Sequence, residues 1–279
     1  MSANVDVDVQ FAGRLGQILG VLMATIVAYL RRSAAYTIEI IRAPLFPLVY
    51  FGSMYMVYSI SGQHSVDGTN LAGFLLVGLF GLEAWRASVW TSGYAIEAER
   101  HEGTIGALFL TPANRLLVIA GYGLGGLIFM VPSLFVIVAL GVVTGARLNI
   151  ADPLAVLAAG ATMVITSLAV GFTLAGAFVL TRRANLLANV IQHPVYLLGS
   201  FIVPRDALPG WLRPFADALP FSHATEALRA ATLRAASLAT IAGELAWALG
   251  ISALCALLGA LLIRRVEYAA KRLGQLELF

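Results

Sequence analysis

The sequence has few charged residues, and this scarcity excludes several classes of protein. Only 12% of its 279 residues are charged, whereas 59% are hydrophobic, and the mean hydropathy is +0.86. A soluble domain has about 25% charged residues. A chain with so little polar surface is not a nucleic-acid-binding protein, a disordered chain or an ordinary soluble enzyme. The composition predicts a membrane protein that crosses the bilayer several times.

Lysine, cysteine and catalytic motifs are almost absent. Lys271 is the only lysine and no glycine-rich loop precedes it, so the chain lacks the Walker A motif that holds nucleotide phosphates. Cys255 is the only cysteine, which excludes a disulfide within the chain and a cysteine metal site. His101-Glu102 begins like the HExxH motif of metalloproteases, but position 105, which the second histidine would occupy, is Ile105. The metalloprotease motif is therefore absent. We therefore expect no catalytic site, metal site or cofactor on this chain.

Stretches without charge mark the membrane spans. A helix needs about 20 apolar residues to cross the hydrocarbon core of a bilayer. Stretches of this kind predict an all-α protein with six transmembrane helices, at 44–60, at 71–95, between 115 and 147, between 152 and 182, at 184–204 and at 238–263.

The apolar run 15–30 is shorter than a normal span, and Arg31 and Arg32 follow it directly. We interpret it as an amphipathic helix that lies in the membrane interface, within an N-terminal segment 1–35. A seventh span remains the alternative. Lys271 and most arginines lie near the two termini and in the loops after the second and fourth spans. The positive-inside rule then predicts that both termini are cytoplasmic.

Two groups of residues inside the predicted spans are unusual. Glu83 and Arg86 are three residues apart, hence on one face of a helix at membrane depth. They form either a self-neutralising pair packed against another helix, or a polar spot that lines a substrate route or a subunit interface. The glycine-rich run 121–126 has no acidic partner downstream. It predicts close helix packing through Gly121 and Gly125 rather than a phosphate-binding loop.

Two loops differ from the other connections. The loop 95–112 carries a cluster of charges on the predicted cytoplasmic side. The loop 204–220 contains four prolines, which limit any helix to one or two turns, with Trp211 as an interfacial aromatic residue. We interpret this second loop as short re-entrant helices that dip into the outer interface. A plain connecting loop is the alternative.

Both loops resemble the signatures of one family, the permeases of ABC type-2 exporters. The first match is the string Glu99-Arg100-x-x-Gly103-Thr104-Ile105, followed by Leu108 and Thr111-Pro112. The second match comprises Gly199, Pro204, Leu208-Pro209-x-Trp211-Leu212, Pro220 and Ala227-Leu228-Arg229. The chain departs from the first signature at Gly106, where the family often has an acid.

The resemblance implies a six-span permease domain, 36–279, in a bacterial plasma membrane. Such a permease pairs with a second copy or a homologous permease, and a separate ABC ATPase binds the ATP and magnesium. By analogy with the family, a coupling helix at 95–107 docks on the ATPase, and gate helices at 205–222 close the outer end. The implied coupling residues are Glu97, Glu99, Arg100, His101, Glu102, Gly103 and Thr104. The implied outer gate comprises Pro204, Leu208, Pro209, Trp211 and Pro220.

The family moves several kinds of cargo, from hydrophobic drugs to polysaccharides. The spans are dominated by alanine, leucine, valine and glycine, which favours an amphiphilic drug, antibiotic or lipid over a polysaccharide or glycolipid. A path along the first, second and fifth spans would include Tyr50, Tyr55, Tyr58, Trp85 and Tyr196. An ion-coupled secondary transporter is a further alternative, although such proteins usually carry several acids inside the membrane. The expected partners are proteins and membrane lipid, without nucleic acid.

Overall fold

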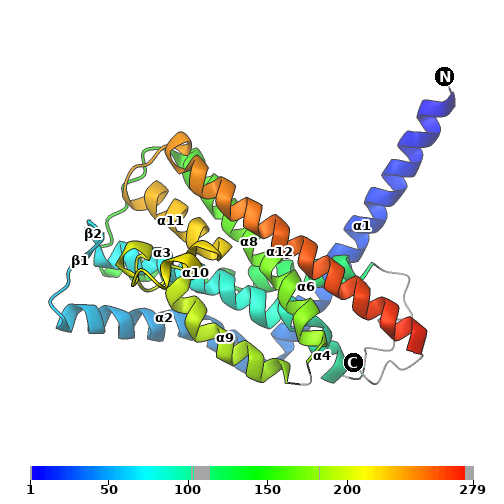
Figure 1. Cartoon of the computed structure of the whole chain (residues 1–279), viewed down its shortest axis with the longest axis horizontal. Helices are drawn as coiled ribbons and strands as arrows, with labels where there is room; N and C mark the ends of the chain where they lie inside the picture. Colours follow the sequence, from blue (N-terminus) through cyan, green and yellow to red (C-terminus); the bar gives the residue numbers. More distant parts are fainter. Residues whose placement is uncertain (1, 102, 104–113, 182, 274–279) are drawn as a thin grey trace.

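The chain folds as a bundle of helices with one small hairpin (Figure 1). The computed structural model describes residues 2–101, 103, 114–181 and 183–273. The longer helices are α1 (Ser2–Ala35), α2 (Thr37–Ile60), α3 (Leu71–Ala87), α6 (Arg115–Phe129), α7 (Val131–Val143), α8 (Pro153–Val179), α9 (Ala184–Leu198), α11 (Pro220–Leu233) and α12 (Leu238–Leu273). The shorter pieces are the strands β1 (Ser65–Val66) and β2 (Thr69–Asn70), the π-helical segment η1 (Ser88–Gly93), α4 (Ala95–His101), the 3-10 turn η2 (Arg205–Ala207) and α10 (Arg213–Asp217).

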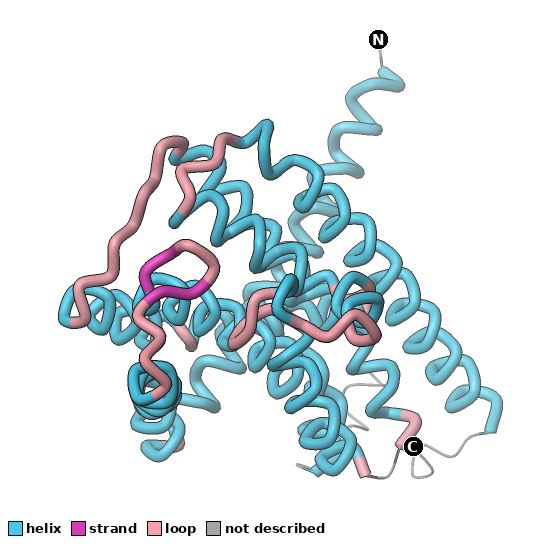
Figure 2. The backbone as a smooth tube through the Cα atoms, turned by 60° about the vertical axis from the view of Figure 1, so that its left-hand side comes forward, coloured by secondary structure: helices cyan, strands magenta, loops and turns pink. Residues whose placement is uncertain are grey.

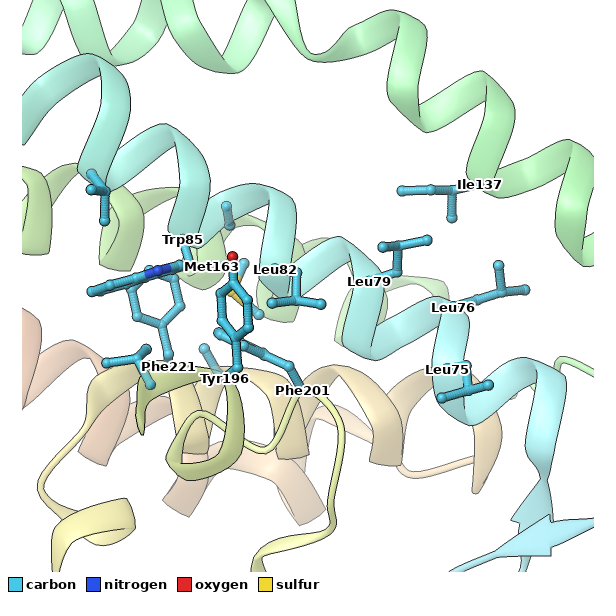
Figure 3. Close-up of a cluster of buried hydrophobic side chains, with 14 of the residues drawn as sticks. Leu75, Leu76, Leu79, Leu82, Trp85, Ile137, Met163, Tyr196, Phe201 and Phe221 are labelled. Atoms are coloured by element: carbon cyan, nitrogen blue, oxygen red, sulfur yellow. The ribbon is translucent and has the colours of Figure 1, made fainter. Parts of the chain in front are cut away.

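Helix α3 forms the centre of the bundle. Apart from Glu83 and Arg86 it is apolar, as expected of a helix that neighbours surround, and almost all of its residues are buried. Figure 3 shows its leucines and Trp85 facing residues from α7, α8, α9 and α11. The ring of Trp85 meets the ring of Phe221 edge to face at 5.8 Å, and Phe201 packs on Phe221 at the same separation.

Helices α8 and α12 run side by side along the bundle (Figure 1). Small residues allow the close approach, because a side chain on Gly259 would collide with the backbone of Phe172. Hydroxyl groups also join the two helices. Thr173 donates to the carbonyl of Cys255 at 2.7 Å, and the hydroxyls of Thr166 and Ser252 lie 3.0 Å apart. This is the usual chemistry of helix contacts in membranes, where lipid competes equally for apolar surface.

Six helical segments of the described chain are long and apolar enough to span a membrane. Five of them match the predicted spans: Ile40–Ile60, Leu71–Gly93, Arg115–Val143, Pro153–Val179 and Leu238–Val266. The sixth is Leu15–Ala35, because α1 continues without a break through Arg31 and Arg32, which follow the apolar run 15–30. Figure 1 shows α1 running across the direction of α8 and α12. Whether this helix lies in the interface or spans the membrane stays a prediction.

The prediction of one continuous fifth span at 184–204 is wrong. Helix α9 ends at Leu198, and the chain turns at Gly199 and at Ser200, whose φ is +58°. The backbone carbonyls that are free of the helix at this break accept hydrogen bonds from side chains inside the protein. The Tyr58 hydroxyl donates to the carbonyl of Ile202 at 2.9 Å, and Arg229 donates to the carbonyl of Phe201 at 3.2 Å. Irregular backbone at membrane depth is stable only with such partners.

The second span ends in the π-helical segment η1 rather than in regular α-helix. Its hydroxyl groups are buried against neighbouring helices, with the Ser88 and Ser167 hydroxyls 3.0 Å apart. Three glycines let the neighbours approach this wider segment, namely Gly123 and Gly126 of α6 and Gly171 of α8. π-Helical turns occur often at functional sites.

Three loops meet at one end of the bundle, as the predicted topology requires. Figure 2 shows the hairpin of β1 and β2 beside the loop that joins α7 to α8. The Asn70 amide donates to the carbonyl of Arg147 at 2.8 Å, and Asn149 N donates to the carbonyl of Thr232 at 2.8 Å. Arg234, which follows α11, forms an ion pair with Asp67 of the hairpin. These contacts connect the loops predicted to lie on the outer side.

The predicted packing role of Gly121 and Gly125 is confirmed. A Cβ atom on Gly121 would lie 2.6 Å from Thr25 of α1, and one on Gly125 would lie 2.9 Å from the Tyr29 ring. The Tyr29 ring then reaches Tyr122, edge to face, at 5.8 Å. Helix α1 therefore packs on α6 at two positions of α6 where only glycine fits.

We expect Gly121→Val to weaken the packing of α1 on α6. The added isopropyl group would collide with Thr25, beginning with its Cβ atom, and overpacking of this kind costs typically about 1–3 kcal/mol. The measurement is the free energy of unfolding of the purified protein in a detergent titration. Gly20→Val in α1 is the matched control, since nothing lies within 4 Å of that position. Equal stability of the two variants would contradict the packing role.

Candidate functional site

Glu83 and Arg86 form an ion pair on one face of α3. The Nη1 atom of Arg86 lies 2.9 Å from Oε1 of Glu83. Glu83 is only 2% exposed, and the guanidinium of Arg86 lies 4.0 Å from the ring centroid of Phe46 in α2. The predicted pairing is confirmed, and the pair is held in place by an aromatic ring of a second helix.

The pair lines a cavity of about 650 Å³, here called the inner cavity. Its walls come from α1, α2, α3 with η1, α6 and α9. Both polar and aromatic side chains line it, among them Arg32, Arg42, Phe46, Trp90, Gln192 and Tyr196. The indole of Trp90 donates to the Gln192 amide oxygen at 3.4 Å. The volume falls in the range of small-molecule sites.

The aromatic residues predicted for a substrate path lie in different places. Tyr196 lines the inner cavity and meets Tyr50 edge to face at 6.1 Å. Tyr55 stacks on Phe51, and the Tyr58 hydroxyl holds the break after α9. Trp85 is 3% exposed and faces the core. Of the five predicted path residues, Tyr196 is the one that lines the inner cavity.

Several charged residues of the predicted coupling helix contact the helical bundle rather than solvent. Helix α4 covers the first part of the predicted range 95–107. Glu97 is buried and pairs with Arg100 at 2.5 Å, while Glu99 accepts a hydrogen bond from the Tyr122 hydroxyl of α6. Gly103 is exposed and has φ +71°. The side chain of His101 and the residues Glu102 and Thr104 lie outside the described residues.

Tyr122 connects α4 to the N-terminal helix. Its hydroxyl binds Glu99, and its ring contacts Tyr29 of α1. The guanidinium of Arg32, also on α1, lies 5.3 Å from the centroid of the same ring. The two segments that the sequence assigns to the cytoplasmic surface therefore meet at one side chain of α6.

The segment 205–222, predicted to form gate helices, contains short helical pieces, while its role as a gate stays a prediction. The segment contains η2, α10 and the start of α11, but α11 continues to Leu233 and is buried over most of its length. Pro220 begins this helix, where its missing N–H is harmless, and small alanines then allow close packing. Among the predicted gate residues, Pro204, Leu208 and Pro220 are buried, whereas Pro209 and Trp211 are exposed.

Arg229 of α11 is a fully buried cation that the sequence did not single out as a site residue. It lies 3.1 Å from Oε1 of Glu226, donates to the Phe201 carbonyl and packs over the Phe74 ring at 3.8 Å. Burial lowers the pKa of Arg229 to about 10, so it remains charged at neutral pH. Its place in the Ala-Leu-Arg match was the one sequence signal that pointed to it.

A second polar cluster joins the gate segment to α12. Arg205 of η2 donates to Glu244 at 2.7 Å, and Nδ1 of His223 lies 2.5 Å from the other oxygen of Glu244. Nε2 of His223 lies 3.0 Å from the backbone carbonyl of Asp217. Burial and the charge of Arg205 lower the pKa of His223, but its bonds to Glu244 and Asp217 outweigh them and raise it. We call these residues the outer latch. The four residues do not form a recognisable motif in the sequence, so sequence reasoning missed this cluster.

We expect Arg229→Met to destabilise the protein by about 3–5 kcal/mol, the usual loss when one partner of a buried ion pair is removed. The substitution leaves the carbonyl of Phe201 without its donor. Arg147→Met, at an exposed loop position, is the control and should change stability by less than about 0.5 kcal/mol. Detergent-titration unfolding measures both. Similar small losses in the two variants would refute the role of Arg229.

We expect the outer latch to weaken as pH rises. The pKa of His223 is raised in the folded protein, so its stabilisation is complete below the unfolded pKa of about 6.5 and is lost as pH rises through the folded pKa. The unfolding free energy of the wild type minus that of His223→Gln should therefore be larger at pH 6 than at pH 9. His64→Gln, in an exposed loop, serves as the control. A difference that is independent of pH would exclude a charged His223.

Comparison with known proteins agrees with this architecture. The model of the ABC-2 type transporter family matches residues 16–233. The daunorubicin resistance ABC transporter permease protein DrrB1 of Streptomyces coeruleorubidus is 23% identical over 197 residues, which cover 70% of this chain and 68% of that protein. The probable doxorubicin resistance ABC transporter permease protein DrrC of Mycobacterium tuberculosis is 26% identical over 171 residues, 61% of this chain and 62% of that protein. Because the family model covers most of the chain, the chain belongs to the ABC-2 type transporter family.

Proposed function

We propose that the chain is the membrane-spanning permease subunit of an ATP-driven exporter that moves an amphiphilic drug, antibiotic or lipid outward. The single observation that carries the proposal is the family match over residues 16–233. The names of the two relatives, which are drug-resistance permeases, support the choice of cargo. The inner cavity, whose lining combines aromatic with polar side chains, can accommodate such an amphiphile.

The proposal requires partners. A separate ABC ATPase subunit binds ATP and magnesium, which agrees with the lack of a Walker A lysine in this chain. A second copy of the permease, or a homologous permease, completes the transport unit. The protein lies in a bacterial plasma membrane with both termini in the cytoplasm, as the distribution of arginines predicts.

The contacts of α4 suggest how movement of the ATPase reaches the spans. A shift of α4 would pull on Tyr122 through Glu99, and thereby on α6. Because Tyr29 and Arg32 of α1 contact the same tyrosine, the N-terminal helix would move with it. In this mechanism α4 and α1 act on one point of the bundle. At the other end, release of the outer latch would free η2 from α12.

The test is the ratio of transported molecules to hydrolysed ATP. The permease, purified with its ATPase and placed in vesicles, should export daunorubicin in an ATP-dependent way. Tyr122→Phe removes only the hydroxyl that Glu99 accepts from. A hydrogen bond to a charged group contributes about 1.5–3 kcal/mol, so we expect the ratio to fall about tenfold.

Two further variants complete this test. Tyr268→Phe, at an exposed position of α12, should leave the ratio unchanged. Reversing both charges, Glu99→Arg with Arg100→Glu, should uncouple ATP hydrolysis from transport while the spans remain folded. If substrate still stimulated hydrolysis normally in this double variant, α4 would not be the coupling element.

A further inference from the structure

A second cavity lies beside the outer latch, and we call it the outer pocket. Its volume is about 460 Å³, which falls in the range of small-molecule sites. Its walls come from η2, α10, α11 and α12, and apart from Trp247 its described lining residues are all charged or histidine. Arg205, His223 and Glu244 already bind one another in the outer latch. The charges that remain for a ligand are those of α10 and of Asp206.

The guanidinium of Arg213 in α10 is held in place without an acid partner. Its Nε atom donates to the carbonyl of Leu208 at 3.1 Å, and Nη2 donates to the carbonyl of Asp206 at 2.6 Å. No carboxylate among the described residues pairs with this arginine, and its side chain is exposed. Arginine is well suited to phosphate groups. Because two carbonyls fix the guanidinium before a ligand arrives, ordering it costs the ligand little entropy.

Asp217 places a negative charge beside this arginine. It follows Arg213 by one turn of α10, so the two side chains lie on one face of the helix. Residues at this spacing commonly pair, but here Arg213 binds the two carbonyls instead. Within the described part of the chain, Asp217 has one ion pair, with Arg205 at 3.6 Å, and its side chain is 55% exposed. A cation and an anion are therefore adjacent, accessible and not paired with each other.

Trp247 of α12 connects the outer pocket to the apolar surface of the bundle. Its ring lies nearly parallel to the ring of His223, with 6.2 Å between centroids, and 66% of the residue is exposed. An exposed indole face attracts an ammonium group. Leu254 and Leu258, also exposed, follow Trp247 by about two and three turns and lie on the same face of α12. An apolar stripe that an acyl chain could cover therefore begins at the wall of the pocket.

The outer pocket lies near one end of a predicted span. The segment Leu238–Val266 has 29 residues and is about 43 Å long, whereas the hydrocarbon core is about 30 Å thick. Its ends therefore reach the head-group regions, and Glu244 lies in the second turn of α12. The distribution of arginines predicts that this end is the outer one. A lipid head group is the ligand that this depth brings to the pocket.

We propose that the outer pocket binds the head group of a zwitterionic phospholipid of the outer leaflet. The phosphate lies on Arg213, the ammonium lies between Asp217 and the ring of Trp247, and an acyl chain runs along the exposed leucines of α12. The lipid then joins α10 to α12 beside the outer latch. This inference goes beyond the proposed export, because the lipid is a bound component of the gate segment rather than cargo. Its binding needs neither ATP nor the ATPase.

The experiment measures the dissociation constants of short-chain lipids for the purified permease in detergent, without ATPase or ATP. Dioctanoyl phosphatidylcholine carries both charges, dioctanoyl phosphatidylmethanol only the phosphate charge, and dioctanoyl ethylphosphatidylcholine only the ammonium charge. We expect phosphatidylcholine to bind about tenfold more tightly than either of the others, the usual effect of one charged contact. Equal affinity for the three lipids would overturn recognition of a zwitterion. If glycerophosphocholine, which has no acyl chains, bound as tightly as phosphatidylcholine, the ligand would not be a lipid.

Two variants should lose opposite halves of this selectivity. Arg213→Gln should weaken the binding of phosphatidylcholine and phosphatidylmethanol about tenfold and should not weaken that of ethylphosphatidylcholine. Asp217→Asn should weaken the binding of the two lipids with an ammonium and keep that of phosphatidylmethanol. Each variant thus still binds one probe, which shows that the pocket is folded. Arg147→Gln, at an exposed loop position, is the matched control and should change no affinity. Equal effects of Arg213→Gln and Asp217→Asn on all three lipids would refute the two assignments.

The aromatic contact is tested with Trp247→Leu, which keeps an apolar side chain but removes the ring. It should weaken the two lipids that carry an ammonium and spare phosphatidylmethanol. Phe135→Leu is the control, because Phe135 is 72% exposed on α7, which does not contribute to the outer pocket. Unchanged binding of ethylphosphatidylcholine by Trp247→Leu would contradict the site. Because no transport is measured, such a failure is distinct from a failure of ATP-driven export.

Discussion

Polar groups inside an apolar bundle must find their partners within the protein, because the hydrocarbon of a membrane supplies none. The break after α9 depends on this constraint. Its carbonyls at Phe201 and Ile202 are free of the helix and accept hydrogen bonds from Arg229 and Tyr58. Arg229 is itself buried and balanced by Glu226. The gate segment can therefore leave the helical bundle only where α11 and α2 bring these donors to it.

The same constraint explains why the functional elements are connected. The charges of α4 are satisfied by Arg100 and Tyr122, so the segment predicted to meet an ATPase is also bonded to α6. Glu83 departs from the rule, since one of its oxygens lacks a partner among the described residues while the other binds Arg86.

The sequence predicted those features that depend on composition and local pattern. Long uncharged runs gave most of the spans, and the spacing of Gly121 and Gly125 gave a helix contact. It failed where distant residues decide the outcome. The end of α9 depends on donors from α2 and α11, and the outer latch joins Arg205, His223 and Glu244 from three elements. Uniform alanine-rich sequence also hid the continuation of α11 to residue 233. A family signature pointed to Arg229, but not to its partners.

The most direct measurement of the central claim is a purification of the tagged chain from its native host in mild detergent, followed by mass spectrometry of everything that co-purifies. A permease of an ABC exporter should bring down a soluble ATPase with a Walker A motif, in about a one-to-one ratio, together with a bound amphiphile. If instead the chain came down without an ATPase, and transported its substrate with an ion gradient but no ATP, the account would be contradicted and the chain would be a secondary transporter.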